Sequence, residues 1–393
     1  MNPVVVVGTG IAGVRAAEAL RAQKYVGEIL FISPEIPCYR PAVSKEALTG
    51  PAGEGFGMPT KRSAEEFTWL LGSQVQSAKL NDQTLQVVDA HGLVSTVHFD
   101  GLVIASGLHS RHLNVPGPTQ GRFTLRTLGD AQVLEPRLVP NARVVILGSG
   151  FIGCEVAAIA SARGCIVTVV SPEEIPLSSA IGDELGRRVA EIHSRHGVTI
   201  LTNQSVAGFG GEDCASSVLL DDGSEIPADA IVEAVGSIAN TAWLQGNGLD
   251  LSNGVLADPF LNVLGTHVPV VACGDIARHP NALFGTTPRR VEHWTVAADL
   301  GTHAGRTLAH KLNAHPHEPM AFGAVPAFWS DQYDIQIQSF GMPSLATDIS
   351  IVESDSDGNC IAEYSDASGL VGVVGINRTS EVARYRKQLS SRA

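Results

Sequence analysis

Two glycine-rich turns carry the residue types and spacing that most clearly indicate chemistry in this chain. The first is Gly8-Thr9-Gly10-Ile11-Ala12-Gly13, and the second is Gly148-Ser149-Gly150-Phe151-Ile152-Gly153. Glycine lets the backbone approach a pyrophosphate closely, and the charge of that pyrophosphate then lies at the N-terminus of a helix. Each turn therefore predicts one bound dinucleotide, and we expect one dinucleotide to be held permanently and the other to exchange.

The elements that position these turns are the same in both places. An apolar strand precedes each turn, and a helical stretch and a second apolar strand follow it. Around the first turn they are Val4–Val7, 14–20 and Ile29–Ile32; around the second they are Val144–Leu147, 154–162 and Ile166–Val170. This βαβ context is the one that the motif requires. A single glycine-rich turn also arises for packing reasons, but two turns in the same context argue strongly against coincidence.

An acidic residue is expected after each second strand, where it would bind the hydroxyls of an adenosine ribose. Glu35 follows the first of these strands. Ser171 directly follows the second, with Glu173 and Glu174 just beyond it, and the serine hydroxyl suits either a ribose 2′-hydroxyl or a 2′-phosphate. Because no arginine or lysine lies within 166–181 and the two carboxylates would repel a phosphate, NADH is favoured over NADPH.

Composition excludes some classes of function. The chain has 393 residues, too many for one ordinary core, and its formal charge is −13. This charge argues against nucleic acid or an anionic membrane as the main partner. No stretch has the roughly 20 uncharged apolar residues of a membrane span, and the first strand begins too early for a secretion or transit peptide. We expect a cytoplasmic protein with six scattered, reduced cysteines and no metal site.

Other segments complete the expected architecture. A buried strand ends at Ala105-Ser106-Gly107, the second nucleotide-binding segment extends to Gly236, and another buried strand enters the turn Gly274-Asp275. From about residue 315, apolar residues alternate over short runs, which predicts antiparallel strands. The predicted fold class is therefore α/β, with two Rossmann-like dinucleotide-binding domains and a smaller C-terminal α+β domain.

Further motifs are spaced along nearly the whole chain. They are Tyr39–Lys45, Leu125–Thr127, Glu155 after the second turn, Val291–Trp294 and Phe328–Tyr333. Together with the glycine turns, these motifs resemble the FAD-dependent ferredoxin reductases that serve cytochrome P450 and ring-hydroxylating dioxygenase systems, the putidaredoxin reductase type. The resemblance implies a glutathione-reductase-like arrangement. In it, residues 1–112 and 237–314 form the FAD-binding domain, 113–236 the NAD(P)H-binding domain and 315–393 the C-terminal domain.

The resemblance also implies a role for each matching position. The residues that would bind FAD are Gly8, Gly10, Ile11, Ala12, Gly13, Glu35, Arg40, Lys45, Ala105, Ser106, Gly107, Arg126, Gly274, Asp275, Trp294 and Trp329. Those that would bind NADH are Gly148, Gly150, Phe151, Ile152, Gly153 and Ser171. Glu292 would lie near the nicotinamide, and Gly236 and His293 are also expected to bind a cofactor.

Lys45, Glu155 and Glu292 are the catalytic residues that the resemblance implies. A cation beside a flavin stabilises the negative charge that reduction places on the ring, and Glu155 opposite Lys45 would hold that cation in place. Taken alone, Lys45 also suits a solvated loop, Glu155 suits the first turn of a helix because of the helix dipole, and Trp329 suits a core. The chain departs from the family pattern at Cys38 and Tyr39, and at Ser171, where the family has an acid.

The electron acceptor follows from the cysteines. Disulfide reductases of the same architecture use a redox-active cysteine pair, which this sequence lacks, and Cys38 lacks the serine–cysteine context of single-cysteine oxidases. We therefore expect electrons to leave the flavin for an external one-electron carrier, a [2Fe-2S] ferredoxin. A rubredoxin- or quinone-type reductase and an NAD(H)-sensing flavoprotein with little turnover are the alternatives. Basic residues that suit an acidic partner, or a solvated helix face, are Arg306, Lys311, Arg384, Arg386 and Lys387.

Overall fold

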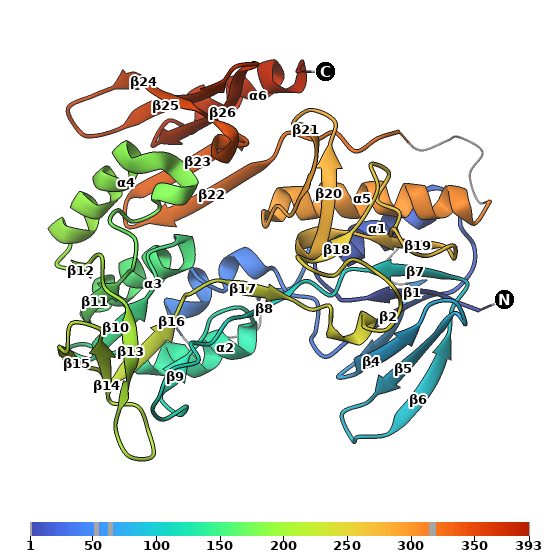
Figure 1. The fold of residues 1–393 in the computed structure, drawn as a ribbon, viewed down its shortest axis with the longest axis horizontal. Coiled ribbons are helices and arrows are strands. Elements are labelled where there is room, and N and C mark those ends of the chain that lie inside the picture. Colours follow the sequence, from blue (N-terminus) through green and yellow to red (C-terminus); the bar gives the residue numbers. More distant parts are fainter. Residues whose placement is uncertain (1, 51–54, 62–65, 314–319, 393) are drawn as a thin grey trace.

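Two nucleotide-binding units with parallel sheets and a C-terminal antiparallel sheet make up the fold (Figure 1). The computed structural model describes residues 2–50, 55–61, 66–313 and 320–392. Within these residues, no helix combines the length and the apolar character that a membrane crossing requires.

The first unit is built on a five-stranded sheet in the order β19-β7-β1-β2-β3. Its centre is β1 (Val4–Val7), four valines buried on both faces, as expected for a parallel strand with layers above and below it. β1 pairs in parallel with its neighbours on both sides. The remaining strands are β2 (Ile29–Ser33), β3 (Thr68–Leu71), β7 (Gly101–Ile104) and β19 (Val270–Ala272).

Two helices pack closely on one face of this sheet. They are α1 (Ile11–Ala22), which follows the first glycine turn, and α5 (Trp294–Lys311). A Cβ added to Gly301 would lie 2.1 Å from the carbonyl oxygen of Ala12, so only glycine permits this approach. The contact places the middle of α5 beside the start of α1, although the two segments are far apart in the sequence.

The second unit repeats this plan with the sheet order β12-β11-β10-β16-β9. β10 (Arg143–Leu147) leads through the second glycine turn into α3 (Phe151–Ala162). The other strands are β9 (Arg122–Phe123), β11 (Ile166–Val170), β12 (Thr199–Leu201) and β16 (Ala230–Glu233), and the other helices are α2 (Leu128–Leu134) and α4 (Ser178–Arg195).

Smaller sheets join and flank these units. β8 (Leu108–Ser110) and β17 (Ser237–Ala239) form an antiparallel pair where the chain crosses between the two units and returns. One flanking three-stranded sheet consists of β4 (Gln74–Lys79), β5 (Thr84–Val88) and β6 (Val94–His98). A second consists of β13 (Val206–Gly210), β14 (Ser217–Leu220) and β15 (Glu225–Pro227). A third consists of β18 (Val255–Leu256), β20 (Ala277–Asn281) and β21 (Gly285–Arg289).

The C-terminal sheet lies over α4, as the top of Figure 1 shows. Buried side chains of α4, among them Ile181 and Val189, share a core with Ile337 and Tyr364 of the sheet. Its strands, in the order β22-β23-β26-β25-β24, are β22 (Ala327–Gln332), β23 (Ile335–Gly341), β24 (Asp348–Ser354), β25 (Cys360–Asp366) and β26 (Gly369–Ile376), followed by α6 (Thr379–Ser390).

The predicted fold class is confirmed, because both glycine turns lie in βαβ units and the C-terminal strands are antiparallel. The chain leaves the first sheet after β7 and returns to it through β19. The four-part division into domains stays a prediction, and its boundary at residues 314 and 315 lies outside the described residues.

Candidate active site

The first glycine turn forms a cradle whose shape depends on the absence of side chains. Gly8 has φ +111°, and a Cβ there would lie 2.2 Å from the carbonyl oxygen of Ala105. A Cβ on Gly13 would lie 2.3 Å from the carbonyl oxygen of Gly8. Gly10, the N-cap of α1, has open space on the side where a Cβ would project. The backbone N–H groups of the first helical turn are therefore accessible to an anion.

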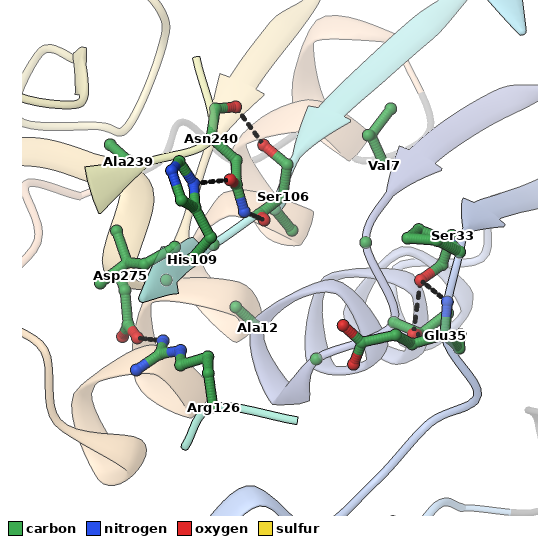
Figure 2. A pocket seen from close by; sticks show the side chains of 18 of the residues that line it. Val7, Ala12, Ser33, Glu35, Ser106, His109, Arg126, Ala239, Asn240 and Asp275 are labelled. Atoms are coloured by element: carbon green, nitrogen blue, oxygen red, sulfur yellow. Dashed lines mark hydrogen bonds and ion pairs between the residues drawn. The ribbon is translucent and has the colours of Figure 1, made fainter. Parts of the chain in front are cut away.

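A cavity of about 770 Å³ opens beside this cradle (Figure 2). The predicted FAD and nicotinamide residues that line it are Gly8, Gly10, Ile11, Ala12, Glu35, Arg40, Ala105, Ser106, Gly107, Arg126, Gly274, Asp275, Glu292 and Trp294. Gly13 lies behind the cradle, while Lys45, His293 and Trp329 are not among the lining residues. The volume falls within the range of cofactor and ligand pockets.

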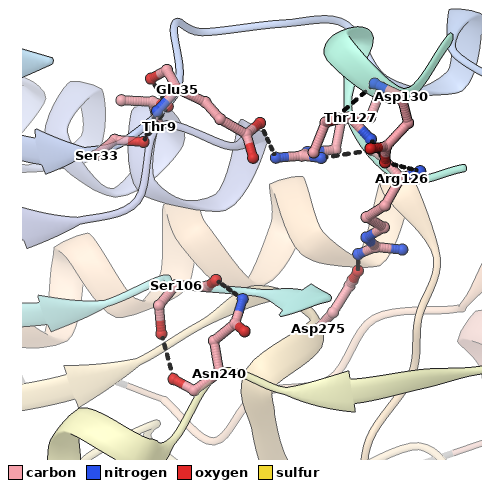
Figure 3. Close-up of polar contacts among 10 residues, drawn as sticks. Thr9, Ser33, Glu35, Ser106, Arg126, Thr127, Asp130, Asn240 and Asp275 are labelled. Carbon is pink, nitrogen blue, oxygen red and sulfur yellow. Dashed lines mark hydrogen bonds and ion pairs between the residues drawn. The ribbon is translucent and has the colours of Figure 1, made fainter. Parts of the chain in front are cut away.

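Charged side chains that line this cavity are joined in a row of ion pairs and hydrogen bonds (Figure 3). The Arg40 guanidinium lies 2.8 Å from a carboxylate oxygen of Glu35 and donates to the carbonyl oxygen of Arg126 at 2.6 Å. Arg126 in turn donates to Asp275 at 2.6 Å, and its backbone is held by Asp130 at the start of α2. Nε of Arg126 is buried without a protein partner, which leaves a donor for a ligand acceptor.

FAD fits this site on three observations. The cradle exposes helix N–H groups where a pyrophosphate would bind. Glu35 uses one carboxylate oxygen for Arg40, so its other oxygen is available to ribose hydroxyls. The unpartnered Nε of Arg126 supplies a buried donor beside Asp275.

Sequence reasoning missed one part of the cavity wall, which is formed by Asn240 and its partners. The Asn240 side chain donates to the carbonyl oxygen of Ser106 at 2.8 Å, and the Ser106 hydroxyl donates to the Asn240 carbonyl oxygen at 3.1 Å. His109 lies 2.6 Å from the Asn240 side-chain oxygen (Figure 2). The β8–β17 pair brings these residues together across 134 positions, so no local sequence signal indicates them.

Lys45 and Glu155 meet between the two units. Nζ of Lys45 lies 3.3 Å from Glu155 Oε1 and 3.5 Å from a carboxylate oxygen of Asp331, and it lies 5.5 Å from the centre of the Trp329 ring. The structure therefore brings together the predicted residues Lys45, Glu155 and Trp329. Asp331 was not predicted as a site residue, although it lies within the Phe328–Tyr333 motif.

The Glu155 carboxylate is almost completely buried. It accepts hydrogen bonds from the hydroxyls of Ser44, at 2.5 Å, and Ser330, at 2.6 Å. Burial raises the pKa of Glu155 above that of an ordinary glutamate, while Lys45 and the two hydroxyls oppose this shift. The charge of Glu155 is thus balanced by residues from two separate segments of the chain, Ser44-Lys45 and Ser330.

Glu292, His293 and Trp294 lie at the start of α5. Glu292 accepts from the Ser237 hydroxyl at 2.9 Å and pairs with the Arg290 guanidinium at 2.9 Å. Trp294 lines the cavity and meets Tyr39 edge to face. Nδ1 of His293 is buried without a protein partner, and burial lowers the pKa of His293 to about 4, so this ring is neutral at neutral pH.

The second glycine turn copies the first, and the contacts of Ser171 copy those of Ser33. Gly148 N–H donates to the end of β11 as Gly8 N–H does to the end of β2. The Ser171 hydroxyl is buried, 2.8 Å from the hydroxyl of Ser149, and accepts from the N–H of Glu173 at 3.1 Å. Ser33 has the matching contacts, with Thr9 and with the N–H of Glu35.

Glu173 is therefore the counterpart of Glu35, and Ser171 is the counterpart of Ser33. The repeated tripeptides Ser33-Pro34-Glu35 and Ser171-Pro172-Glu173 are the sequence signal that shows this correspondence. Of the other predicted NADH residues, Gly148 has φ +102°, and a Cβ on Gly153 would lie 2.1 Å from the Gly148 carbonyl oxygen. Gly150, Phe151 and Ile152 lie at the start of α3, and Gly236 immediately precedes β17.

Comparison with known proteins identifies the family of this chain. Residues 2–301 match the family model described as pyridine nucleotide-disulphide oxidoreductase, and residues 327–393 match the model described as reductase C-terminal. The chain belongs to this family of two-nucleotide oxidoreductases.

The relatives of this chain indicate which branch of the family it belongs to. The ferredoxin–NAD(+) reductase component of the anthranilate 1,2-dioxygenase system from Burkholderia cepacia is 33% identical over 87% of this chain and 82% of the relative. Putidaredoxin reductase from Pseudomonas putida is 29% identical over 99% of this chain and 92% of the relative. The crystal structure of the covalent putidaredoxin reductase–putidaredoxin complex matches with a TM-score of 0.90 and 28% identity, covering 100% of this chain and 93% of that one. The resemblance to reductases of the putidaredoxin reductase type is confirmed.

Proposed function

We propose that this chain is an NADH-dependent ferredoxin reductase, which takes hydride from NADH onto FAD and passes single electrons to a [2Fe-2S] ferredoxin that feeds a cytochrome P450 or a dioxygenase. Bound FAD supplies the conversion of a two-electron donor into one-electron transfers. The observation that carries the proposal is the pairing of Lys45 with the buried Glu155, placed between a dinucleotide cavity and a second glycine turn.

The residues of the first cavity bind and orient FAD. The N-terminus of α1 would hold the pyrophosphate, and the free carboxylate oxygen of Glu35 would accept from the adenosine ribose. Asp275, held by Arg126, would accept from the ribityl chain. Because Arg40 joins Glu35 to the segment that carries Arg126, these contacts form one connected frame.

The second glycine turn binds NADH in the same way. Glu173 is held in the same way as Glu35 and would accept from the ribose hydroxyls as Glu35 would in the first unit. A carboxylate at this position repels a 2′-phosphate, which favours NADH over NADPH. Ser171 acts through Glu173, since its buried hydroxyl holds the N–H of that residue.

Lys45 would supply a cation that stabilises the negative charge of a reduced flavin. Its ammonium group is held between Glu155 and Asp331 and above the Trp329 ring, so its position is fixed before the reaction. Glu292, which lines the cavity near Trp294, is held by Ser237 and Arg290 and orients the nicotinamide side of the site.

The state of the thiols in this chain supports an electron acceptor outside the protein. Cys38, near the cavity, is buried, and burial raises its pKa, so it stays protonated and is a poor nucleophile. Burial raises the pKa of Cys154 and Cys273 to about 12. The relatives' names point to ferredoxin as the acceptor. Because NADH and reduced thiols belong to a reducing compartment, we also propose a cytoplasmic location.

Cytochrome c reduction tests this proposal. The purified holoenzyme is mixed with NADH and cytochrome c, with and without a [2Fe-2S] ferredoxin. Fast reduction that requires the ferredoxin supports the proposal. Equal turnover with a rubredoxin or a small quinone contradicts the ferredoxin assignment, and slow turnover with every acceptor, together with a long-lived charge-transfer complex, indicates an NAD(H) sensor instead.

A further inference from the structure

A line of hydrogen-bonded side chains runs from the Lys45–Glu155 pair toward the C-terminal end of α4. The Ser330 hydroxyl donates to Glu155 Oε1 at 2.6 Å. The same hydroxyl oxygen accepts from the side-chain amide of Gln332 at 3.1 Å. Ser330 and Gln332 lie two positions apart on β22, so both side chains point to the same face of the sheet.

The line continues into α4. The side-chain oxygen of Gln332 lies 2.9 Å from Nε2 of His193, and Nδ1 of His193 lies 3.1 Å from the hydroxyl of Tyr333. The Tyr333 ring then stacks on the ring of His196, with centroids 3.7 Å apart and planes 10° apart. The line therefore reaches the exposed end of α4.

Burial fixes the direction of every bond in this line. Glu155, Ser330, Gln332 and His193 are each at most 4% exposed, so no water competes for their polar atoms. The side-chain oxygen of Gln332 only accepts, which requires a proton on Nε2 of His193. Burial also lowers the pKa of His193 and keeps the ring neutral, so Nδ1 accepts from Tyr333.

The amide group of Gln332 consequently presents its NH2 to Ser330. The Ser330 oxygen is then occupied as an acceptor, and its proton is left for Glu155. Each donor in the line points toward the Glu155 carboxylate.

A strained residue ends the line. Tyr333 has φ +54° in the two-residue turn between β22 and β23, a position that favours glycine or asparagine. Such strain persists only where surrounding contacts hold the residue in place. Here the stack on His196 and the bond to His193 hold the tyrosine in this conformation.

We infer that Gln332, His193 and Tyr333 are positioning residues that keep the Ser330 hydroxyl turned toward Glu155 and so hold Glu155 as the charged partner of Lys45. This inference rests on the proposed function, in which the Lys45–Glu155 pair adjoins the nicotinamide. The titratable groups that face the line from the elements around it are Lys45 of the first unit, Asp331 of β22, Cys154 of α3 and His196 of α4.

The test measures the titration of Glu155 directly. Oxidised holoenzyme carrying 13C at glutamate side-chain carboxyls is titrated by NMR without NADH, and the Glu155 signal is identified by its loss in Glu155→Gln. Gln332→Met keeps the side-chain length and removes the donor to Ser330. We expect the midpoint pH of Glu155 to rise by about one unit, because the carboxylate loses a fixed donor. Gln86→Met, which removes an exposed amide–hydroxyl bond on β5, is the matched control and leaves the midpoint unchanged.

Two more variants separate positioning from packing. Tyr333→Phe keeps the stacked ring and removes only the hydroxyl, so it tests the line even if Gln332→Met fails to fold; its midpoint rises by a smaller amount. Ser330→Ala raises the midpoint at least as much as Gln332→Met, and the double variant moves no further than Ser330→Ala alone, because Gln332 acts through Ser330.

Specific outcomes overturn the inference. The inference is refuted if the midpoint pH of Glu155 stays at the wild-type value in both Gln332→Met and Tyr333→Phe. It is also refuted if the shifts of Gln332→Met and Ser330→Ala add up in the double variant. A shift in Gln332→Met without one in Tyr333→Phe removes His193 and Tyr333 from the line. The titration needs no NADH and no ferredoxin, so its failure is distinct from a failure of the proposed function, which shows as absent NADH-dependent reduction.

Discussion

Glu173 occupies in the second nucleotide-binding unit the position that Glu35 occupies in the first. In each unit a buried serine at the end of the second strand accepts from the glutamate N–H, at 3.1 Å for Ser171 and 3.2 Å for Ser33. The repeat therefore extends from the glycine turns to the two glutamates that we propose bind a ribose.

Replacing Glu173 tests its place at the NADH ribose. We expect Glu173→Ala to raise KM for NADH about tenfold and to narrow the preference over NADPH, since hydrogen bonds to a charged group are worth about 1.5–3 kcal/mol. Steady-state kinetics with both nucleotides measure this change. Glu174→Ala, at the exposed neighbouring position, is the control. Equal behaviour of the two variants would remove Glu173 from the site.

Lys45→Ala should retain FAD but slow its reduction by NADH about 10²-fold, because the variant lacks the fixed cation beside the reacting rings. Stopped-flow absorbance at the flavin band measures the rate, and the bound FAD per chain is measured on the same sample. Lys79→Ala, on exposed β4, serves as the control. An unchanged reduction rate would place Lys45 outside the chemistry.

The rate of flavin reduction should depend on pH through Glu155. Burial raises the pKa of Glu155, so its carboxylate is present above that pKa and is lost as the pH falls through it. Protonation removes the partner of Lys45, and the rate should fall on the acid side. In Glu155→Gln this acid limb should disappear. Persistence of the same limb in the variant would assign it to another group.

Alanine substitutions at two glycines of the first turn should affect different properties, one the stability of the fold and the other the retention of FAD. Gly8→Ala places a Cβ 2.2 Å from the Ala105 carbonyl oxygen at a φ of +111° and should destabilise the fold by at least about 1–3 kcal/mol. Gly10→Ala meets nothing within 4 Å, so the unfolding free energy should hardly change while FAD retention falls. Denaturant unfolding and FAD content per chain separate the two effects. Full retention of FAD by Gly10→Ala would contradict the cradle.

Charge reversal on α6 tests where an acidic ferredoxin docks. Arg386 and Lys387 are exposed, and Arg386→Glu with Lys387→Glu should raise KM for ferredoxin several-fold at low salt while flavin reduction by NADH stays unchanged. The difference should shrink at high salt because the interaction is screened. Lys24→Glu, on the first unit, is the control. A change in KM for ferredoxin that does not depend on salt, or no change, would place the ferredoxin-docking surface elsewhere.

The parts of this molecule that sequence reasoning predicted are local. The two turns, their flanking strands and Glu35 follow from short-range patterns that the βαβ geometry requires. The contact of Ser330 with Glu155 joins residues 175 positions apart, and the contact of Asn240 with Ser106 joins residues 134 apart, so both depend on how the sheets assemble. Glu173 could also have been predicted from the sequence, because the Ser-Pro-Glu tripeptide that contains Glu35 is repeated there.

Anaerobic reduction tests the central claim most directly. The yellow holoenzyme is mixed with one equivalent of NADH and then with excess oxidised [2Fe-2S] ferredoxin, and the flavin and iron–sulfur absorbances are followed. We predict that NADH bleaches the flavin and that two ferredoxins are then reduced for each NADH consumed. A protein that purifies without colour and cannot be reconstituted with FAD, or a flavin that NADH reduces but ferredoxin does not reoxidise, would contradict the account.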